Sequence, residues 1–449
     1  MAPVPCVQGY RGLRIFGKEV TSVAFAKKRW ICLIAGVVIE FLNGIAYAWS
    51  VFQTPLVDKF GWSISQISMA YTLYFLVLML MSLFCGAKLK KMFSIRTEVL
   101  IGAILYGGGI LLMGFMRGGV WELYLFFGVI ASVGTAMIYP VLISYALELF
   151  PERTGFAGGL MTAGYGLGAV VWAPFSVIVM ERTGNVSTAF IMMGIMFLVG
   201  IVVLSRFLQA VPAGFRNEIL SKRAAAASGE QNAKAKAPKM GLYNVGKPQM
   251  IRLPVFYLAM ISLLIGLACG SMIITQGSPI LQLKFGMIPT VTAVIVSFLS
   301  ITNTIGRLVW GGISDRIGKT RTLLMVQLFT AIFMALLFVV GEQGLFIAVL
   351  LGTTFCYGGA ACLVAPTTEE LFGGEHISEN YSVTYSAFGL SSLIGPVVIS
   401  NIRQSTGAYT MGFAVAAIMA VVGCVVTLLI LSKMRAHQKA AQASGALDG

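Results

Sequence analysis

The chain has few charged side chains and almost no histidine. Asp, Glu, Lys and Arg make up 11% of its 449 residues, and it contains 2 His. Soluble domains carry roughly 25% charged residues, so this shortage excludes a cytosolic enzyme, a disordered scaffold and a secreted domain. Together with 57% hydrophobic residues and a mean hydropathy of +0.87, it indicates an integral membrane protein.

Paired cysteines and nucleotide-binding loops are also missing. The seven cysteines are odd in number and include no CxxC pair, which argues against a disulfide framework or a zinc site. The run Gly164–Gly168 resembles a dinucleotide loop but lies inside an apolar segment, and Gly312–Thr320 is one residue too long for a phosphate loop. We therefore expect no cofactor, no metal, no nucleotide and no nucleic acid partner.

Long apolar runs fill most of the chain. Each is close to the ~20 residues that a membrane-spanning helix needs, and they form two sets of six around a polar stretch, which we interpret as a flexible cytoplasmic linker. The predicted fold is an all-α membrane protein of 12 transmembrane helices in two six-helix bundles. The runs are 30–52, 64–86, 97–116, 120–145, 156–179, 187–208, 254–280, 291–313, 321–340, 345–367, 381–402 and 410–432.

These runs divide the chain into five parts. Residues 1–29 form an N-terminal segment, 30–208 the first bundle, 209–250 the linker, 251–432 the second bundle and 433–449 a tail. If both termini lie in the cytoplasm, all but six of the Lys and Arg residues fall on the cytoplasmic side. Arg307 lies within a span, and the other five lie in outer loops: Lys59, Arg117, Arg182, Lys284 and Arg403. Such asymmetry sets orientation in a membrane, so the net charge of +15 fits a multi-pass protein of the plasma (inner) membrane.

The two halves repeat each other. The pattern Gly86-x-x-x-Lys90-Lys91 recurs as Gly311-x-x-x-Asp315-Arg316, and Pro140 recurs as Pro366. Two related bundles are typical of transporters that work by alternating access, in which one half rocks against the other around a central site.

Three segments resemble a known family. The loop from Gly311 to Arg321, with Asp315, Arg316 and Gly318, resembles the loop motif of the major facilitator superfamily. Asn43–Phe52 and Asn303–Arg307 resemble segments of the oxalate/formate antiporter family and its monocarboxylate-transporting relatives. The resemblance implies a secondary transporter and not an enzyme. The first-half copy departs from the motif, because Lys90 stands where the superfamily usually has aspartate.

Arg307 is the main candidate for binding a substrate. An arginine at the centre of a spanning helix costs about 2.5–3.5 kcal/mol, and it shares a polar stripe with Ser300, Asn303, Thr304, Gly311 and Ser314. Its guanidinium matches the geometry of a carboxylate, and the resemblance implies that the arginine at this position binds the substrate carboxylate. The alternative is that Arg307 snorkels or only ties helices together.

Glu40 is the acidic residue deepest in a span, and it heads a stripe of Asn43, Tyr47, Ser50 and Thr54. We hypothesise that it carries a coupled proton and neutralises Arg307 in the empty site. A locally paired glutamate without a transport role is the alternative.

Aromatic residues supply the other candidates. The resemblance places Tyr47, Tyr139 and Tyr357 at positions that line the site, and Tyr385 lies on the polar face of the eleventh span. Oxalate exchangers carry a second cation, a lysine, where this chain has Phe388. One cation suits one carboxylate, so we predict a small monocarboxylate such as formate, lactate or pyruvate. Proton symport and anion exchange both stay open, with an oxalate/formate-type exchanger as the alternative and a carboxylate sensor as a remote one.

Charged residues at the cytoplasmic mouth suggest a gate. Lys88, Lys90 and Lys91 could pair with acidic residues of the loop between spans ten and eleven, which are Glu369, Glu370, Glu375 and Glu379. The alternative is independently solvated charges, because exposed ion pairs contribute only about 0–1 kcal/mol.

Overall fold

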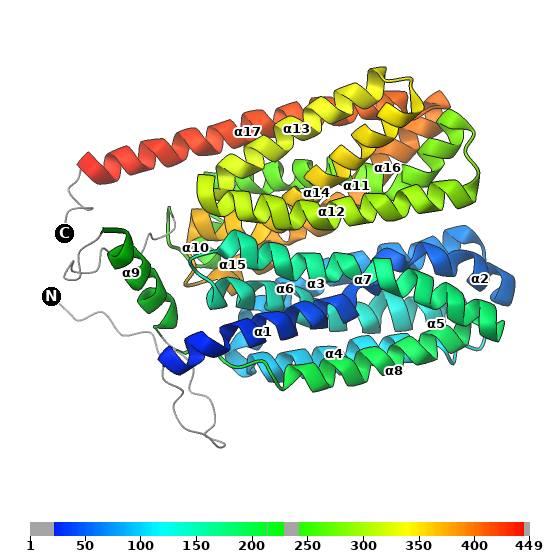
Figure 1. Cartoon of the computed structure of the whole chain (residues 1–449), viewed down its shortest axis with the longest axis horizontal. Coiled ribbons are helices and arrows are strands. Elements are labelled where there is room, and N and C mark those ends of the chain that lie inside the picture. Colours follow the sequence, from blue (N-terminus) through cyan, green and yellow to red (C-terminus); the bar gives the residue numbers. More distant parts are fainter. Residues whose placement is uncertain (1–21, 213, 229–241, 444–449) are drawn as a thin grey trace.

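The computed structural model describes residues 22–212, 214–228 and 242–443, and in these ranges the regular structure is entirely helical. Long helices lie side by side in two halves, α1 to α8 below and α11 to α17 above in the view of Figure 1. The start of α1, helix α9 and the end of α17 lie at the same end of the molecule. We call it the cytoplasmic end, following the sequence prediction.

The helices of the first half follow the predicted runs closely. They are α1 (Ser22–Asn43), the 3₁₀ segment η1 (Gly44–Ala48), α2 (Ser50–Phe60), α3 (Ile64–Met92), α4 (Ile95–Met113), α5 (Val120–Leu123), the π-helical η2 (Tyr124–Ala131), α6 (Ser132–Leu149), α7 (Thr154–Thr183) and α8 (Val186–Ser205).

The linker and the second half contain nine helices in the described ranges. The linker holds α9 (Phe215–Ser228) and α10 (Lys247–Met250). The second half comprises α11 (Pro254–Phe285), α12 (Pro289–Ile317), α13 (Lys319–Val339), α14 (Gln343–Phe372), α15 (Ile377–Thr384), α16 (Ser386–Thr406) and α17 (Thr410–Ala443).

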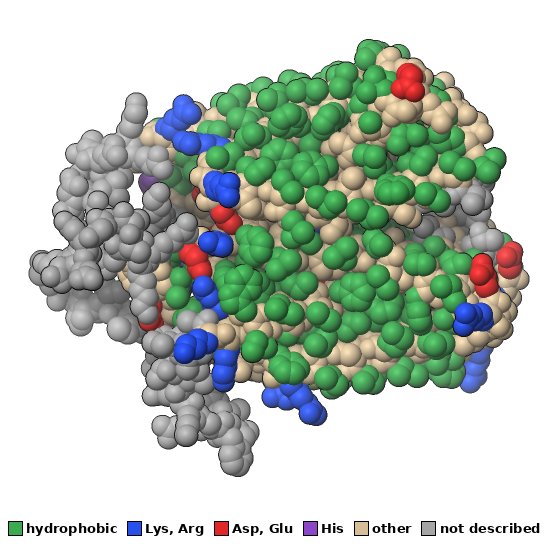
Figure 2. All heavy atoms as spheres, in the orientation of Figure 1, with side chains coloured by type: hydrophobic (Ala, Val, Ile, Leu, Met, Phe, Trp, Pro, Cys, Tyr) green, Lys and Arg blue, Asp and Glu red, His purple; other side chains and the backbone are tan. Residues whose placement is uncertain are grey.

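Eleven segments of the described chain are long and apolar enough to cross a membrane. The predicted second span coincides with α3, whose apolar part within the described residues is the shorter stretch Met69–Leu83. A count of twelve spans therefore stays a prediction. Figure 2 shows hydrophobic side chains covering the middle of the molecule, with Lys and Arg gathered towards its ends. A soluble protein does not expose so large an apolar surface, whereas lipid contact accounts for it.

Two predicted spans change from an α-helix to another type of helix. The first changes to a 3₁₀ helix at Gly44–Ala48, where a continuous helix was expected, and the fourth contains the π-helical stretch Tyr124–Ala131. The 3₁₀ segment lies against α7, where a Cβ atom on Gly44 would come within 2.2 Å of the Tyr165 carbonyl oxygen. Such departures inside long helices often occur at functional sites.

Glycines bring α7 of the first half against α12 of the second. A Cβ atom on Gly155 would lie 2.3 Å from the Gly311 carbonyl oxygen, and one on Gly159 would lie 2.5 Å from the Arg307 carbonyl oxygen. Because any larger residue would push the helices apart, this contact closes the interface between the halves on the cytoplasmic side of Arg307.

The predicted flexible linker is partly ordered. Phe215 of α9 packs its ring on Phe25 of α1, with centroids 5.1 Å apart. The backbone N–H groups of Leu242, Tyr243 and Val245 donate to the carbonyl oxygens of Glu370, Leu371 and Phe372, which satisfies groups that a helix end leaves unpaired. Residues 229–241, with three of the linker lysines, lie outside the described chain.

Candidate functional site

Arg307 lies in the middle of α12 and is fully buried between the two halves. Its Nη1 donates to the Thr162 carbonyl oxygen of α7 (2.6 Å), and its Nη2 donates to the Tyr47 hydroxyl of η1 (3.4 Å). The guanidinium carbon is 5.9 Å from the centroid of the Tyr47 ring. Arg307 therefore does not snorkel to the surface. It links its own half to two elements of the other.

Asn303, one turn before Arg307, holds the guanidinium in place. Its Oδ1 accepts from Arg307 Nε (3.1 Å), and its Nδ2 donates to the Thr354 carbonyl oxygen of α14 (3.4 Å). Close packing of α14 explains this position, because a Cβ atom on Gly358 would come within 2.0 Å of the Asn303 carbonyl oxygen. The predicted substrate-binding residue thus orients the cation.

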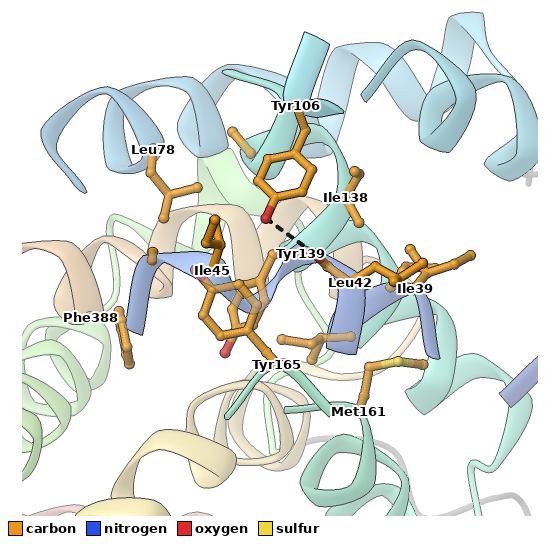
Figure 3. Close-up of a cluster of buried hydrophobic side chains, with 14 of the residues drawn as sticks. Ile39, Leu42, Ile45, Leu78, Tyr106, Ile138, Tyr139, Met161, Tyr165 and Phe388 are labelled. Atoms are coloured by element: carbon orange, nitrogen blue, oxygen red, sulfur yellow. Dashed lines mark hydrogen bonds between the residues drawn. The ribbon is translucent and has the colours of Figure 1, made fainter. Parts of the chain in front are cut away.

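Aromatic rings continue from Arg307 through both halves. The Tyr47 and Tyr165 centroids are 5.3 Å apart, and those of Tyr165 and Tyr139 are 4.7 Å apart. Tyr139 lies 5.5 Å from Tyr385, which stacks on Phe388 at 5.6 Å. Figure 3 shows Tyr139 and Tyr165 next to each other. Tyr357, buried on α14, lies within electrostatic range of Arg307.

Tyr165 is a site residue that the sequence did not single out. It lies in the glycine run Gly164–Gly168, and its buried hydroxyl makes no hydrogen bond of normal geometry to a described residue. The next residue, Gly166, lies beside Arg307, since a Cβ atom there would lie 3.7 Å from the Arg307 Cζ atom.

Glu40 is fully buried in α1 but does not contact Arg307. Its Oε2 accepts from Asn43 Nδ2 (3.3 Å), and its Oε1 has no partner among the described residues. Although both side chains are described, Glu40 and Arg307 form no ion pair. Both groups are buried, and Arg307 acts on the Glu40 carboxyl at a distance. That Glu40 neutralises Arg307 in the empty site stays a prediction.

The second-half loop motif joins the halves at the cytoplasmic end. Both carboxylate oxygens of Asp315 accept from the first turn of α7, from Gly155 N (2.8 Å) and Phe156 N (2.7 Å). A negative charge is favoured at a helix N-terminus. Lys319 also pairs with Asp315, and Gly318 ends α12 with a positive φ of 99°. Arg316 is exposed on the same turn.

Two acidic residues of the predicted lysine gate have partners in the described chain. Glu369 Oε1 pairs with Arg216 Nη2 of the linker helix at 2.5 Å. Glu370 accepts from the N–H groups of Lys319 (3.0 Å) and Thr320 (2.7 Å) at the start of α13. Each carboxylate thus has a partner of its own, and the pairing with the lysines stays a prediction. The side chains of Lys88, Lys90 and Lys91 lie outside the described part of the structure.

The site combines one buried cation with neutral hydroxyl, amide and aromatic groups. Nothing among the described residues groups three His, Cys, Asp or Glu side chains closely enough to hold a metal ion. A cation flanked by planar rings and hydroxyl groups can bind a small anion through hydrogen bonds and contact area.

The similar proteins described below are transporters. The chain is 25% identical over 417 residues to an oxalate:formate antiporter from Oxalobacter formigenes, covering 92% of this chain and 94% of that one. It is 27% identical to an MFS-type transporter, YhjX, from Escherichia coli K12, covering 83% and 88% of the two chains. Human monocarboxylate transporter 12 is 22% identical over 73% of this chain and 66% of its own.

Family and fold comparisons agree with these relatives. The model of the Major Facilitator Superfamily matches residues 33–396 and 277–447. The crystal structure of the transporter FucP has the same fold, with a TM-score of 0.64 at 14% identity, over 90% of this chain and 99% of that one. The resemblance noted in the sequence is confirmed: this chain belongs to the Major Facilitator Superfamily, as a multi-pass membrane transporter related to oxalate:formate antiporter and to monocarboxylate transporters.

Proposed function

We propose that the chain is a secondary active transporter of small monocarboxylate anions such as lactate, pyruvate or formate. The proposal rests on one observation, that Arg307 is buried without an acidic partner among the described residues. Its guanidinium is fully buried, and its hydrogen-bond partners in the described chain are neutral, namely Thr162, Asn303 and Tyr47. A buried charge without a counter-ion is costly, and a substrate carboxylate would supply that counter-ion.

The geometry of Arg307 also supports alternating access. A carboxylate can accept two parallel hydrogen bonds from a guanidinium, and in doing so it would compete with the Thr162 carbonyl and the Tyr47 hydroxyl. Both of these acceptors belong to the first half, while Arg307 belongs to the second. Substrate binding would therefore weaken a link between the halves, which favours their relative motion.

Position 388 supports a monocarboxylate over a dicarboxylate. Phe388 stacks on Tyr385 with 7° between the ring planes, at the far end of the chain of rings that begins at Tyr47. A second carboxylate of the substrate would face rings there, without a cation at this position. Leaving one buried charge uncompensated would reduce affinity for a dianion such as oxalate.

Proton coupling is assigned to Glu40. The carboxyl is fully buried and has one hydrogen-bond donor in the described chain, so the neutral form suits its surroundings better than the ion. The alternative is exchange of one anion for another. It is favoured by the similarity to a protein named oxalate:formate antiporter, which extends over 92% of this chain.

Thermal stabilisation of the purified protein by a panel of carboxylates tests the substrate class. We expect formate, lactate or pyruvate to raise the melting temperature of the wild type but not of Arg307→Ala. Gln327→Ala is the control, because Gln327 is equally buried in the same half but bonds to Ser262 and Thr427. Stabilisation by oxalate at lower concentration than by any monocarboxylate would overturn the proposal.

Uptake into vesicles tests the coupling. With an imposed proton gradient, we expect the wild type to accumulate substrate and Glu40→Gln to lose accumulation while it still exchanges substrate for substrate. If accumulation by the wild type ignores the proton gradient and depends only on an anion inside the vesicle, the exchanger alternative is correct.

A further inference from the structure

Glu40 stands at the end of a buried chain of hydrogen bonds that crosses three elements. Asn43 Nδ2 donates to Glu40 Oε2 (3.3 Å), Thr135 Oγ1 donates to Asn43 Oδ1 (2.9 Å), and the Tyr74 hydroxyl lies 2.7 Å from Thr135 Oγ1. All four residues have exposed fractions of 0%. They come from α1, α6 and α3 of the first half.

The orientation of the Asn43 amide sets the direction of the other bonds in this chain. Asn43 Oδ1 can only accept a hydrogen bond, so Thr135 must donate its single hydroxyl hydrogen to it. Tyr74 must then donate to Thr135. With its Oδ1 directed at Thr135, the Asn43 amide turns its Nδ2 towards Glu40, so Glu40 Oε2 is the acceptor in that bond.

The far end of the chain is held rigidly. Ser132 Oγ donates to the Tyr74 carbonyl oxygen (2.5 Å), and the Tyr74 ring stacks on Phe127, with centroids 4.6 Å apart. Asn43 itself directly precedes the 3₁₀ segment. An amide is also a poor proton relay, because it would have to pass through a charged or imidic form. The chain therefore fixes an orientation and is not a route for protons.

We propose that Asn43, Thr135 and Tyr74 are positioning residues that reserve Glu40 Oε2 as a hydrogen-bond acceptor, so that Oε1 is the atom that takes up and releases the coupling proton. The inference rests on the proposed proton coupling. In the step itself, hydronium gives its proton to Oε1 and becomes water, the Oε1–H bond forms, and the carboxylate becomes neutral. The reverse step returns the proton to water.

The surroundings of Glu40 agree with this assignment. Arg307 of α12 is the cation that acts on the carboxyl, and the tyrosines within electrostatic range are Tyr74 of α3, Tyr106 of α4, Tyr139 of α6 and Tyr381 of α15. Tyr106 donates to the Leu42 carbonyl oxygen (3.2 Å), as Figure 3 shows. Oε1 is the carboxyl oxygen left without a partner among the described residues.

Infrared difference spectroscopy of the full-length protein in lipid vesicles, recorded during a pH titration, tests the assignment. The carboxyl band that disappears in Glu40→Gln belongs to Glu40. In Asn43→Ala and Thr135→Val we expect its C=O stretch to move to higher wavenumber, because Oε2 loses a fixed donor. Thr135→Ser keeps the hydroxyl and should restore the wild-type band.

Thr427→Val is the matched control. Thr427 Oγ1 donates to Gln327 Oε1 (2.7 Å) in a buried network of the other half, as Thr135 does to Asn43. It should leave the Glu40 band unchanged. We also expect proton-driven accumulation to fall about tenfold or more in Asn43→Ala, since a hydrogen bond to a charged group is strong, while exchange of substrate without a proton gradient continues.

The experiments distinguish loss of proton coupling by Glu40 from loss of its positioning by Asn43 and Thr135. If wild-type accumulation ignores the proton gradient, or no band is lost in Glu40→Gln, proton coupling by Glu40 is wrong and the inference fails with it. If coupling and the band are present but neither changes in Asn43→Ala and Thr135→Val, only the positioning role is wrong. The conservative Thr135→Val variant keeps the test usable should Asn43→Ala fold poorly.

Discussion

At the scale of single residues, Tyr165 and Tyr106 can be compared directly. Both are buried tyrosines of the first half, but the Tyr106 hydroxyl donates to the Leu42 carbonyl oxygen while the Tyr165 hydroxyl has no partner in the described chain. Tyr165 also contacts the rings of Tyr47 and Tyr139. We therefore propose that the Tyr165 hydroxyl contacts the substrate, whereas that of Tyr106 stabilises the fold.

We predict that Tyr165→Phe raises the KM for uptake about tenfold or more, because a hydrogen bond to an anionic ligand is lost, and leaves the melting temperature unchanged. Tyr106→Phe should do the reverse: it should lower stability by about 1 kcal/mol without changing KM. Uptake kinetics and thermal unfolding of both variants check the pair. Equal KM values in the two variants would remove Tyr165 from the site.

Sequence alone predicted the burial of the two charged residues of the candidate site. Arg307 and Glu40 could be predicted because an ionised group is costly in an apolar span. Tyr165 could not, because a tyrosine in such a run is unremarkable until its neighbours are known. The missing contact between Arg307 and Glu40 was equally hidden, because two residues at the same depth on different helices can face different partners.

At the scale of helices, the contact between α7 and α12 depends on glycine. A Cβ atom on Gly155 would lie 2.1 Å from Ser314 Oγ and 2.3 Å from the Gly311 carbonyl oxygen, whereas one on Gly312 would meet nothing within 4 Å. The same turn of α7 donates two N–H groups to Asp315. Gly155 and Gly312 thus differ in contact, although they lie near the same interface.

We predict that Gly155→Ala separates the two helices and destabilises the arrangement in which the cytoplasmic end is closed, by about 1–3 kcal/mol as is usual for overpacking. Gly312→Ala should have almost no effect. Alkylation of a cysteine introduced near the cytoplasmic mouth measures the opening, and we expect faster labelling only in Gly155→Ala. Equal labelling in the two glycine variants would contradict this.

Hydrophobic runs predicted where most helices lie, but not where they are distorted. The first span follows one long, mainly apolar run, yet it becomes 3₁₀ at Gly44–Ala48, where a Cβ atom on Gly168 of α7 would lie 2.9 Å from the Gly44 Cα atom. The distortion arises from a contact between distant segments, and a periodicity in one segment cannot report that.

At the scale of the whole molecule, the linker connects the halves mechanically as well as covalently. Helix α9 packs on α1 of the first half through Phe215 and Phe25, and it pairs Arg216 with Glu369 on α14 of the second half. Lys247, in α10, donates to the Leu83 carbonyl oxygen of α3 (3.3 Å). The polar composition of this stretch indicated a flexible tether, because a single ion pair and a single ring contact leave no periodic pattern.

If the linker holds the cytoplasmic end closed, breaking the pair between Arg216 and Glu369 should open it. The pair is largely shielded from water, with exposed side-chain fractions of 23% and 9%, so Arg216→Gln leaves Glu369 buried without its partner and costs more than losing an exposed pair would.

Arg206→Gln is the control, because Arg206 is an exposed arginine at the end of α8. Distances between spin labels on the cytoplasmic ends of the two halves should lengthen in Arg216→Gln alone, and exchanging the charges in an Arg216→Glu, Glu369→Arg double variant should shorten them again. Unchanged distances in Arg216→Gln would mean that the glycine contact of α7 with α12 and the Asp315 cap close this end without the linker.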